Sequence, residues 1–226
     1  MLLFSGIMIS LSLGMLCTLV LKKLLPQLPV ADEKFYSFVI SGVSFQGVAL
    51  LLTHHFLRQH GMSWSEFLGL NQPTLRQSLL ITLGVIAVAS PVAMLLNEAS
   101  LRIILLFRDQ AEMQPTMKIL EVSLGPVRRT LFGLTAIVLA PLVEEILFRA
   151  LLYPTIKELG YPRAAIFGTA LLFAAIHGSL MTMLPLFFLA LAWTLLYEKT
   201  NTLLAPIVAH SVFNAVNFFM FLSQQA

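Results

Sequence analysis

Three charged side chains interrupt a long apolar run, and they are the first residues whose types and spacing could do chemistry. Residues 141–149 read PLVEEILFR, which places Glu144, Glu145 and Arg149 within an otherwise hydrophobic segment. Glu145 and Arg149 are four residues apart, so they can pair on one face of a helix. Glu144 lies about 100° around that helix from Glu145 and is left out of the pair. Such a carboxylate suits a general base; the alternative is a salt-bridge cluster that only orders the fold.

Two histidines and an asparagine on later segments favour the catalytic interpretation. His177 ends the stretch FAAIH at residues 173–177, and His210 begins the stretch HSVFN at residues 210–214. His210 and Asn214 are four residues apart and share a helical face. A single buried histidine is usually a hydrogen-bonded core residue. Two of them on separate apolar segments, together with the Glu-Glu-Arg segment, are harder to explain as core residues alone.

The three polar centres are also predicted to lie at one depth. Glu144 is 13 residues from Lys157, His177 is 14 from Arg163, and His210 is 11 from Lys199. At 1.5 Å per helical residue, these separations correspond to depths of about 20, 21 and 17 Å from the same charged side. The agreement indicates that the centres meet at one level, as a shared site requires.

The elements that must position these residues are membrane helices. Of 226 residues, 58% are hydrophobic and only 11% are charged, against about 25% charged in an average soluble domain. This composition excludes a soluble enzyme, a disordered chain and a disulfide-rich secreted module. The single cysteine, Cys17, cannot form an intrachain disulfide. The net charge of +3 fits basic loops that face anionic membrane lipids, and it does not indicate nucleic-acid binding.

Hydropathy predicts an all-α, polytopic membrane helical bundle with about seven transmembrane helices, six to eight being compatible with the pattern. Residues 164–197 would form a helix of about 51 Å, which is too long for a bilayer core of about 30 Å. We therefore expect this stretch to turn between Gly178 and Leu184, at Gly178-Ser179 and Pro185. The predicted spans are 1–21, 35–57, 77–97, 130–153, 164–178, 184–197 and 200–226. A cleaved signal peptide is the alternative for the first of them.

The rest of the chain adds organisation and orientation. The chain is predicted to be one integral membrane domain, 1–226, with a motif-bearing core at 129–222. We expect residues 60–77 to lie at the membrane interface and residues 101–107 to form a separate surface helix. With seven spans, five Lys and Arg residues fall on the side of the N-terminus and eight on the other. The positive-inside rule then places the N-terminus outside and the C-terminus in the cytoplasm.

The three motifs together resemble those of the CPBP family, the CAAX-protease and bacteriocin-processing intramembrane proteases. This family includes the type II CAAX prenyl endopeptidase. The matching patterns are EExxxR at 144–149, FxxxH at 173–177 and HxxxN at 210–214, in family order, over roughly residues 129–222. The resemblance implies a peptidase, and it implies a multi-pass protein of a bacterial inner membrane, with a eukaryotic endomembrane as the alternative.

The resemblance also implies a role for each motif residue. Glu144 would activate water, His177 would position that water or share its proton, and His210 and Asn214 would donate to the oxyanion. Supporting roles around them would fall to Glu145, Arg149 and Phe173. Amide hydrolysis needs these parts: an activated water, oxyanion donors and an acid for the leaving amine. The substrate is expected to be a membrane-associated or lipid-modified protein or peptide.

Alternatives to this interpretation remain open at the level of sequence. Glu144, His177 and His210 could instead bind zinc, although no His-Glu-x-x-His pattern occurs and we expect no metal cofactor. A catalytically silent scaffold or bacteriocin-immunity-type protein could use the same fold. A proton-coupled transporter is a further class, but it would be expected to show paired halves, and the sequence shows no such symmetry.

Overall fold

The computed structural model describes residues 2–107, 115–122 and 125–225, and every regular element in these ranges is helical. This confirms the predicted all-α polytopic membrane fold. Two compact units are present, each built from two stretches of the chain: Met1–Phe67 with Thr116–Val143, and Leu68–Pro115 with Glu144–Ala226. Each unit is described by itself below.

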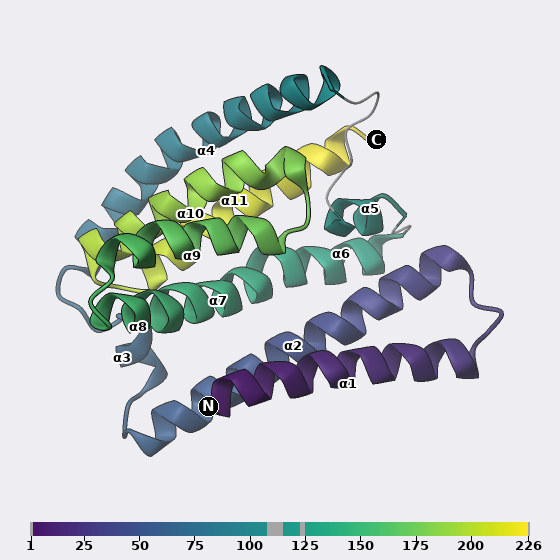
Figure 1. Cartoon of the computed structure of the whole chain (residues 1–226), viewed down its shortest axis with the longest axis horizontal. Coiled ribbons are helices and arrows are strands. Elements are labelled where there is room, and N and C mark those ends of the chain that lie inside the picture. The colour runs from purple at the N-terminus through teal and green to yellow at the C-terminus, as the bar shows by residue number, and fades with distance from the viewer. Residues whose placement is uncertain (1, 108–114, 123–124, 226) are drawn as a thin grey trace. The chain divides into compact units, whose positions relative to one another are not determined.

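The first unit is built on two long helices, α1 (Leu2–Leu24) and α2 (Val30–Gln59), which lie side by side (Figure 1). The Lys22 ammonium pairs with the Glu33 carboxylate at 3.1 Å across their connection. The short helix α5 (Pro115–Val122) and the start of the next long helix, α6 (Pro126–Leu134), complete this unit. Phe132 of α6 stacks on Phe38 of α2, with 5.0 Å between ring centroids.

One continuous helix runs from Pro126 to Glu158 and carries the Glu-Glu-Arg motif. It begins with α6 and contains two π-helical stretches, η1 (Thr135–Leu139) and η2 (Ile146–Leu152), which flank α7 (Ala140–Glu145). It ends with α8 (Tyr153–Glu158). Such π-helical insertions are rare and concentrate at functional sites. The second begins directly after the two glutamates.

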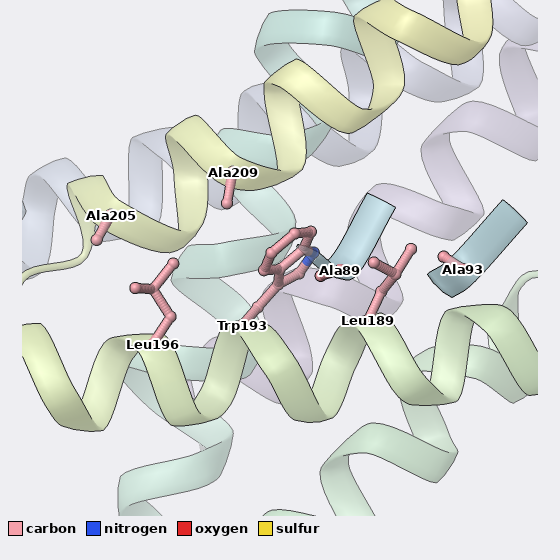
Figure 2. Packing of buried hydrophobic residues seen from close by; sticks show 7 residues of the cluster. All are labelled: Ala89, Ala93, Leu189, Trp193, Leu196, Ala205 and Ala209. Carbon is pink, nitrogen blue, oxygen red and sulfur yellow. The ribbon is translucent and has the colours of Figure 1, made fainter. Parts of the chain in front are cut away.

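The second unit is organised around α10 (Leu180–Thr200), which packs against α4 (Leu75–Leu105), α9 (Pro162–Ile176) and α11 (Leu204–Ser223). Its largest buried cluster sets big side chains of α10 against alanines of α4 and α11, as Figure 2 shows. Its members are Ala89, Ala93, Leu189, Trp193, Leu196, Ala205 and Ala209. Small residues let membrane helices approach closely, and here they make room for the indole.

Seven apolar helices occupy the seven predicted places in the described ranges. Five of them are long and apolar enough to cross a membrane: Val30–Gln59, Leu75–Leu105, Pro126–Glu158, Leu180–Thr200 and Leu204–Ser223. The helix Pro162–Ile176 has only 15 residues, which correspond to about 22 Å. It is therefore shorter than a bilayer core of about 30 Å.

Two local predictions are wrong. The predicted surface helix at 101–107 is not separate, because α4 continues to Leu105 and the Arg102–Glu98 pair, at 2.7 Å, bridges one of its turns. The reversal before α10 is shorter than the predicted 178–184. Gly178 alone takes a left-handed conformation, φ +66°, and Pro185 lies inside α10. Membrane helices tolerate proline because neighbouring groups satisfy the freed carbonyl.

One further short helix lies in the chain between α2 and α4. The helix α3 (Trp64–Leu68) lies in the stretch predicted to be interfacial. Ser63 and Glu66 form a capping box at its start: the Ser63 N–H donates to the Glu66 carboxylate at 2.8 Å, and the Glu66 N–H donates to the Ser63 hydroxyl at 3.3 Å. Within the second unit, the Thr202 hydroxyl donates to the Leu68 carbonyl at 2.8 Å.

Candidate active site

The pairing of Glu145 with Arg149, predicted from their spacing, is confirmed and is deeply buried. Arg149 Nη1 lies 2.9 Å from Glu145 Oε1, and the side chains are 2% and 0% exposed. Arg149 Nη2 also donates to the Ala190 carbonyl of α10 at 3.1 Å. The guanidinium lies over the Phe173 ring of α9, 5.1 Å from its centroid. Arg149 thus joins three helices while it neutralises Glu145.

His210 of α11 extends this pair and brings in the second glutamate. Its Nδ1 lies 2.9 Å from Glu145 Oε1. Because an ionised carboxylate can only accept, Nδ1 carries the hydrogen in this contact. The other ring nitrogen, Nε2, lies 3.8 Å from Glu144 Oε2. One imidazole therefore spans two adjacent carboxylates, so Glu144 and His210 are neighbours, as a common depth would require.

Glu144 differs from Glu145 in what its carboxylate contacts. The Glu144 side chain is 24% exposed, whereas that of Glu145 is fully buried. Glu144 Oε2 is itself buried and has no hydrogen-bond partner among the described residues. A buried polar oxygen of this kind normally finds a partner in protein or water. Glu145 Oε2 is also buried without a hydrogen-bond partner, but the Glu145 side chain is fully buried and paired with Arg149 and His210. Glu144, which is partly exposed, is thus the carboxylate of the motif that a further ligand can reach.

Phe173 connects the two histidines. Its ring centroid lies 4.8 Å from that of His177 and 5.8 Å from that of His210, and the side chain is 1% exposed. His177 is half-buried at the end of α9, where its Nδ1 lies 2.7 Å from the Phe173 carbonyl oxygen. Because a carbonyl can only accept, Nδ1 is the donor, and a neutral ring then keeps Nε2 as an acceptor.

Asn214 and Asn217 follow His210 on α11 at successive turns. Asn214 is half-buried, one turn after His210. Asn217 Nδ2 donates to the Phe213 carbonyl at 2.8 Å, so its amide is engaged with its own helix. Direct contacts join six of the sequence-predicted residues to one another: Glu144, Glu145, Arg149, Phe173, His177 and His210.

Sequence reasoning missed two parts of this site. The Ala190 carbonyl anchors Arg149, and no side-chain signal marks it because every residue carries such an acceptor. The π-helical turn Ile146–Leu152 also went unpredicted, because a local change of backbone hydrogen bonding leaves hydropathy unaltered.

The donor set does not fit a zinc centre. Among residues 2–107, 115–122 and 125–225, no three His, Cys, Asp or Glu side chains are grouped so that they could hold a metal ion. His210 and His177 each have Nδ1 engaged, with Glu145 and with a backbone carbonyl respectively, and this leaves Nε2 as the nitrogen that could bind a ligand in each ring. That the reaction needs no metal stays a prediction, which activity measurements with a chelator would test.

Comparison with known proteins gives one family match. Residues 126–216 match the family model described as type II CAAX prenyl endopeptidase Rce1-like. The matched segment nearly coincides with the predicted core at 129–222 and contains all three motifs. No curated protein and no solved structure gave a significant match.

Proposed function

We propose that the protein is an intramembrane protease of the CAAX-protease (CPBP) family, because residues 126–216 match the type II CAAX prenyl endopeptidase Rce1-like model. We further propose that it cleaves a membrane-associated or lipid-modified polypeptide with water activated by Glu144. The family match supports peptidase activity in a membrane. The identity of the base and the absence of a metal are the finer parts of the proposal.

One observation carries the choice of base. Each glutamate keeps one buried carboxylate oxygen without a hydrogen-bond partner. The Glu145 side chain is 0% exposed and its charge is paired with Arg149 and His210, whereas the Glu144 side chain is 24% exposed. A general base must meet the water whose proton it abstracts, and Glu144 is the carboxylate that a water can reach.

The reaction then follows from the contacts. Glu144 removes a proton from water as the water oxygen bonds to the scissile carbonyl carbon, and the carbonyl oxygen becomes an oxyanion. The tetrahedral intermediate collapses as the C–N bond breaks, and protonated Glu144 returns its proton to the leaving nitrogen. The products are a new carboxyl group and a new amine, and Glu144 ends the cycle ionised.

His210 is proposed to donate a hydrogen bond to the oxyanion through its Nε2. Its Nδ1 is held by Glu145, so Nε2 is the nitrogen that faces Glu144 and the reaction. With hydrogens on both nitrogens, the ring would donate to Glu145 and to the oxyanion at once. Before the attack the cluster would carry two anions, Glu144 and Glu145, and two cations, Arg149 and His210. Once Glu144 has taken the proton of the water, the oxyanion replaces it as the second anion. Such a balance lowers the cost of charge inside a membrane.

His177 and Asn214 complete the proposal as positioning and oxyanion groups. The His177 and His210 rings both contact the Phe173 ring, and His177 Nε2 can accept a hydrogen bond from the attacking water. Asn214 lies one turn beyond His210, and its amide would supply a second oxyanion donor. Removing one such donor typically lowers turnover by about 10²–10³-fold.

The direct test uses purified full-length protein in detergent with a library of membrane-associated peptides, analysed by mass spectrometry for new termini. We expect defined cleavage by the wild type and none by Glu144→Gln. Absence of cleavage of any library member by the wild type would favour the silent-scaffold alternative. Equal turnover by the two proteins on a cleaved peptide would refute Glu144 as the base.

A further inference from the structure

A pocket of about 330 Å³ lies on the first unit, formed by residues that the proposed reaction does not use. Its wall comes mainly from the first third of α2, and α5 closes it with one side chain. The lining residues are Glu33, Lys34, Ser37, Phe38, Ser41 and Ile119. Four of the α2 residues follow at intervals of three, one and three, so they lie along one helical face.

The polar groups of this face are available to a ligand. Within the described part of the chain, the Lys34 ammonium and the hydroxyls of Ser37 and Ser41 have no hydrogen-bond or ion-pair partner. Lys34 and Ser41 are exposed, and Ser37 is half-buried. The pocket therefore offers one cation and two hydroxyl donors in a row along the helix.

The acidic groups nearby are already neutralised. Glu33, the one carboxylate of the lining, pairs with Lys22 at 3.1 Å. Asp32, in the same helical turn, pairs with Arg128 at 2.5 Å. Lys34 therefore contributes an uncompensated positive charge, and the pocket favours an anion.

The order of the groups along α2 matches the order of groups in a phospholipid. Counted from Lys34 at 1.5 Å per residue, Ser37 lies about 4.5 Å and Ser41 about 10 Å farther along the helix. A headgroup layer occupies about 5–8 Å on each side of the hydrocarbon core. Lys34 thus corresponds to the phosphate level, and the serines to the level of the ester carbonyls and below. Phe38 and Ile119 supply apolar surface for acyl chains.

We propose that this pocket binds an anionic phospholipid, with its phosphate on Lys34, an ester carbonyl on Ser37, and an acyl chain that runs past Ser41 against Phe38 and Ile119. A free phosphate would use Lys34 alone and would gain nothing from the apolar wall. The loop before α2 also lies on the side predicted to face the cytoplasm, where the leaflet is richer in anionic lipid.

The test measures lipid binding and does not depend on proteolysis. Full-length protein in neutral detergent is titrated with phosphatidylglycerol, with phosphatidylcholine or with inorganic phosphate, and bound lipid is counted by native mass spectrometry. One lysine near a membrane surface contributes about 1 kcal/mol, so Lys34→Gln should bind phosphatidylglycerol about five-fold more weakly. The Ser37→Ala and Ser41→Ala double variant should also bind it more weakly.

Lys23→Gln is the matched control, since Lys23 is an equally exposed cation near the same end of the unit and does not line the pocket. It should retain wild-type binding. The proposal would be overturned if Lys23→Gln lost as much affinity for phosphatidylglycerol as Lys34→Gln, or if Lys34→Gln kept the wild-type affinity. It would also be overturned if the wild type bound phosphatidylcholine as well as phosphatidylglycerol. Binding of inorganic phosphate that competes with the lipid at similar concentration would assign the pocket to a soluble anion and overturn it as well.

Discussion

Replacing Glu144 with glutamine is expected to abolish proteolysis without weakening the fold. Glutamine keeps the length and shape of the side chain but cannot take a proton from water. General-base catalysis typically contributes about 10²–10⁴-fold, so turnover should fall by at least this factor. Glu144 Oε2 has no hydrogen-bond partner to lose. Its ion pair with His210 is long, at 3.8 Å, and the Glu144 side chain is partly exposed. The free energy of unfolding should therefore fall by less than for Glu145→Gln.

The neighbouring substitution, Glu145→Gln, is expected to have the opposite profile. Glu145 is 0% exposed and receives both Arg149, at 2.9 Å, and His210, at 2.9 Å. Glutamine can still accept one hydrogen bond, but it leaves the Arg149 charge buried and uncompensated. Breaking a buried pair in this way costs about 3–5 kcal/mol. A side-chain hydrogen bond between membrane helices is worth only about 0.6 kcal/mol. A loss of unfolding free energy well above that value would therefore come from the unpaired Arg149 charge and not from a lost hydrogen bond.

The assay combines two measurements on each variant: equilibrium unfolding in mixed micelles, and turnover of a cleaved peptide under conditions where the protein stays folded. We expect Glu144→Gln to be stable and inactive, and Glu145→Gln to be unstable with a smaller loss of turnover per folded molecule. The reverse pattern, with Glu144→Gln unstable and Glu145→Gln stable but inactive, would refute the assignment of the two carboxylates.

Three further predictions concern other parts of the chain. Gly69→Ala should destabilise the protein by more than Gly61→Ala in thermal unfolding: both glycines have positive φ, +76° and +63°, but only at Gly69 would a Cβ lie 2.5 Å from the Thr202 hydroxyl oxygen. Hydrogen bonds from the Ser63 N–H and hydroxyl hold the pKa of Glu66 below its ordinary value of 4.5. The capping box should thus stabilise α3 fully above pH 4.5 and lose this effect as the pH falls through the lowered pKa of Glu66. Hydrogen exchange at residues 63–68, measured against pH, would show this loss of protection. The Ser63→Ala variant should lose most of the pH dependence. Finally, zinc chelators should leave proteolysis unchanged, and a loss of activity that added metal restores would contradict the metal-free mechanism.

The membrane spans could be predicted because the bilayer imposes a length and a composition that one sequence reveals. The errors arose where that constraint ends. Residues beyond Asn97 carry Glu98 and Arg102, which signal an interface, yet the two charges pair across one helical turn and the helix continues to Leu105. Pro185 signals a break, yet it is accommodated inside α10 because Gly178 has already reversed the chain.

In the candidate site, too, some contacts could be predicted from sequence spacing, and others depend on how the helices pack. A spacing of four was enough to pair Glu145 with Arg149, and similar depths were enough to bring Glu144 and His210 to one level. Spacing alone did not show that a single imidazole contacts both glutamates, Nδ1 on one and Nε2 near the other. Adjacent helical residues point about 100° apart, so one ring can serve both only if its helix enters between them. The position of α11 places the His210 ring between the two glutamates. Its Nδ1 can therefore pair with Glu145 while its Nε2 faces Glu144.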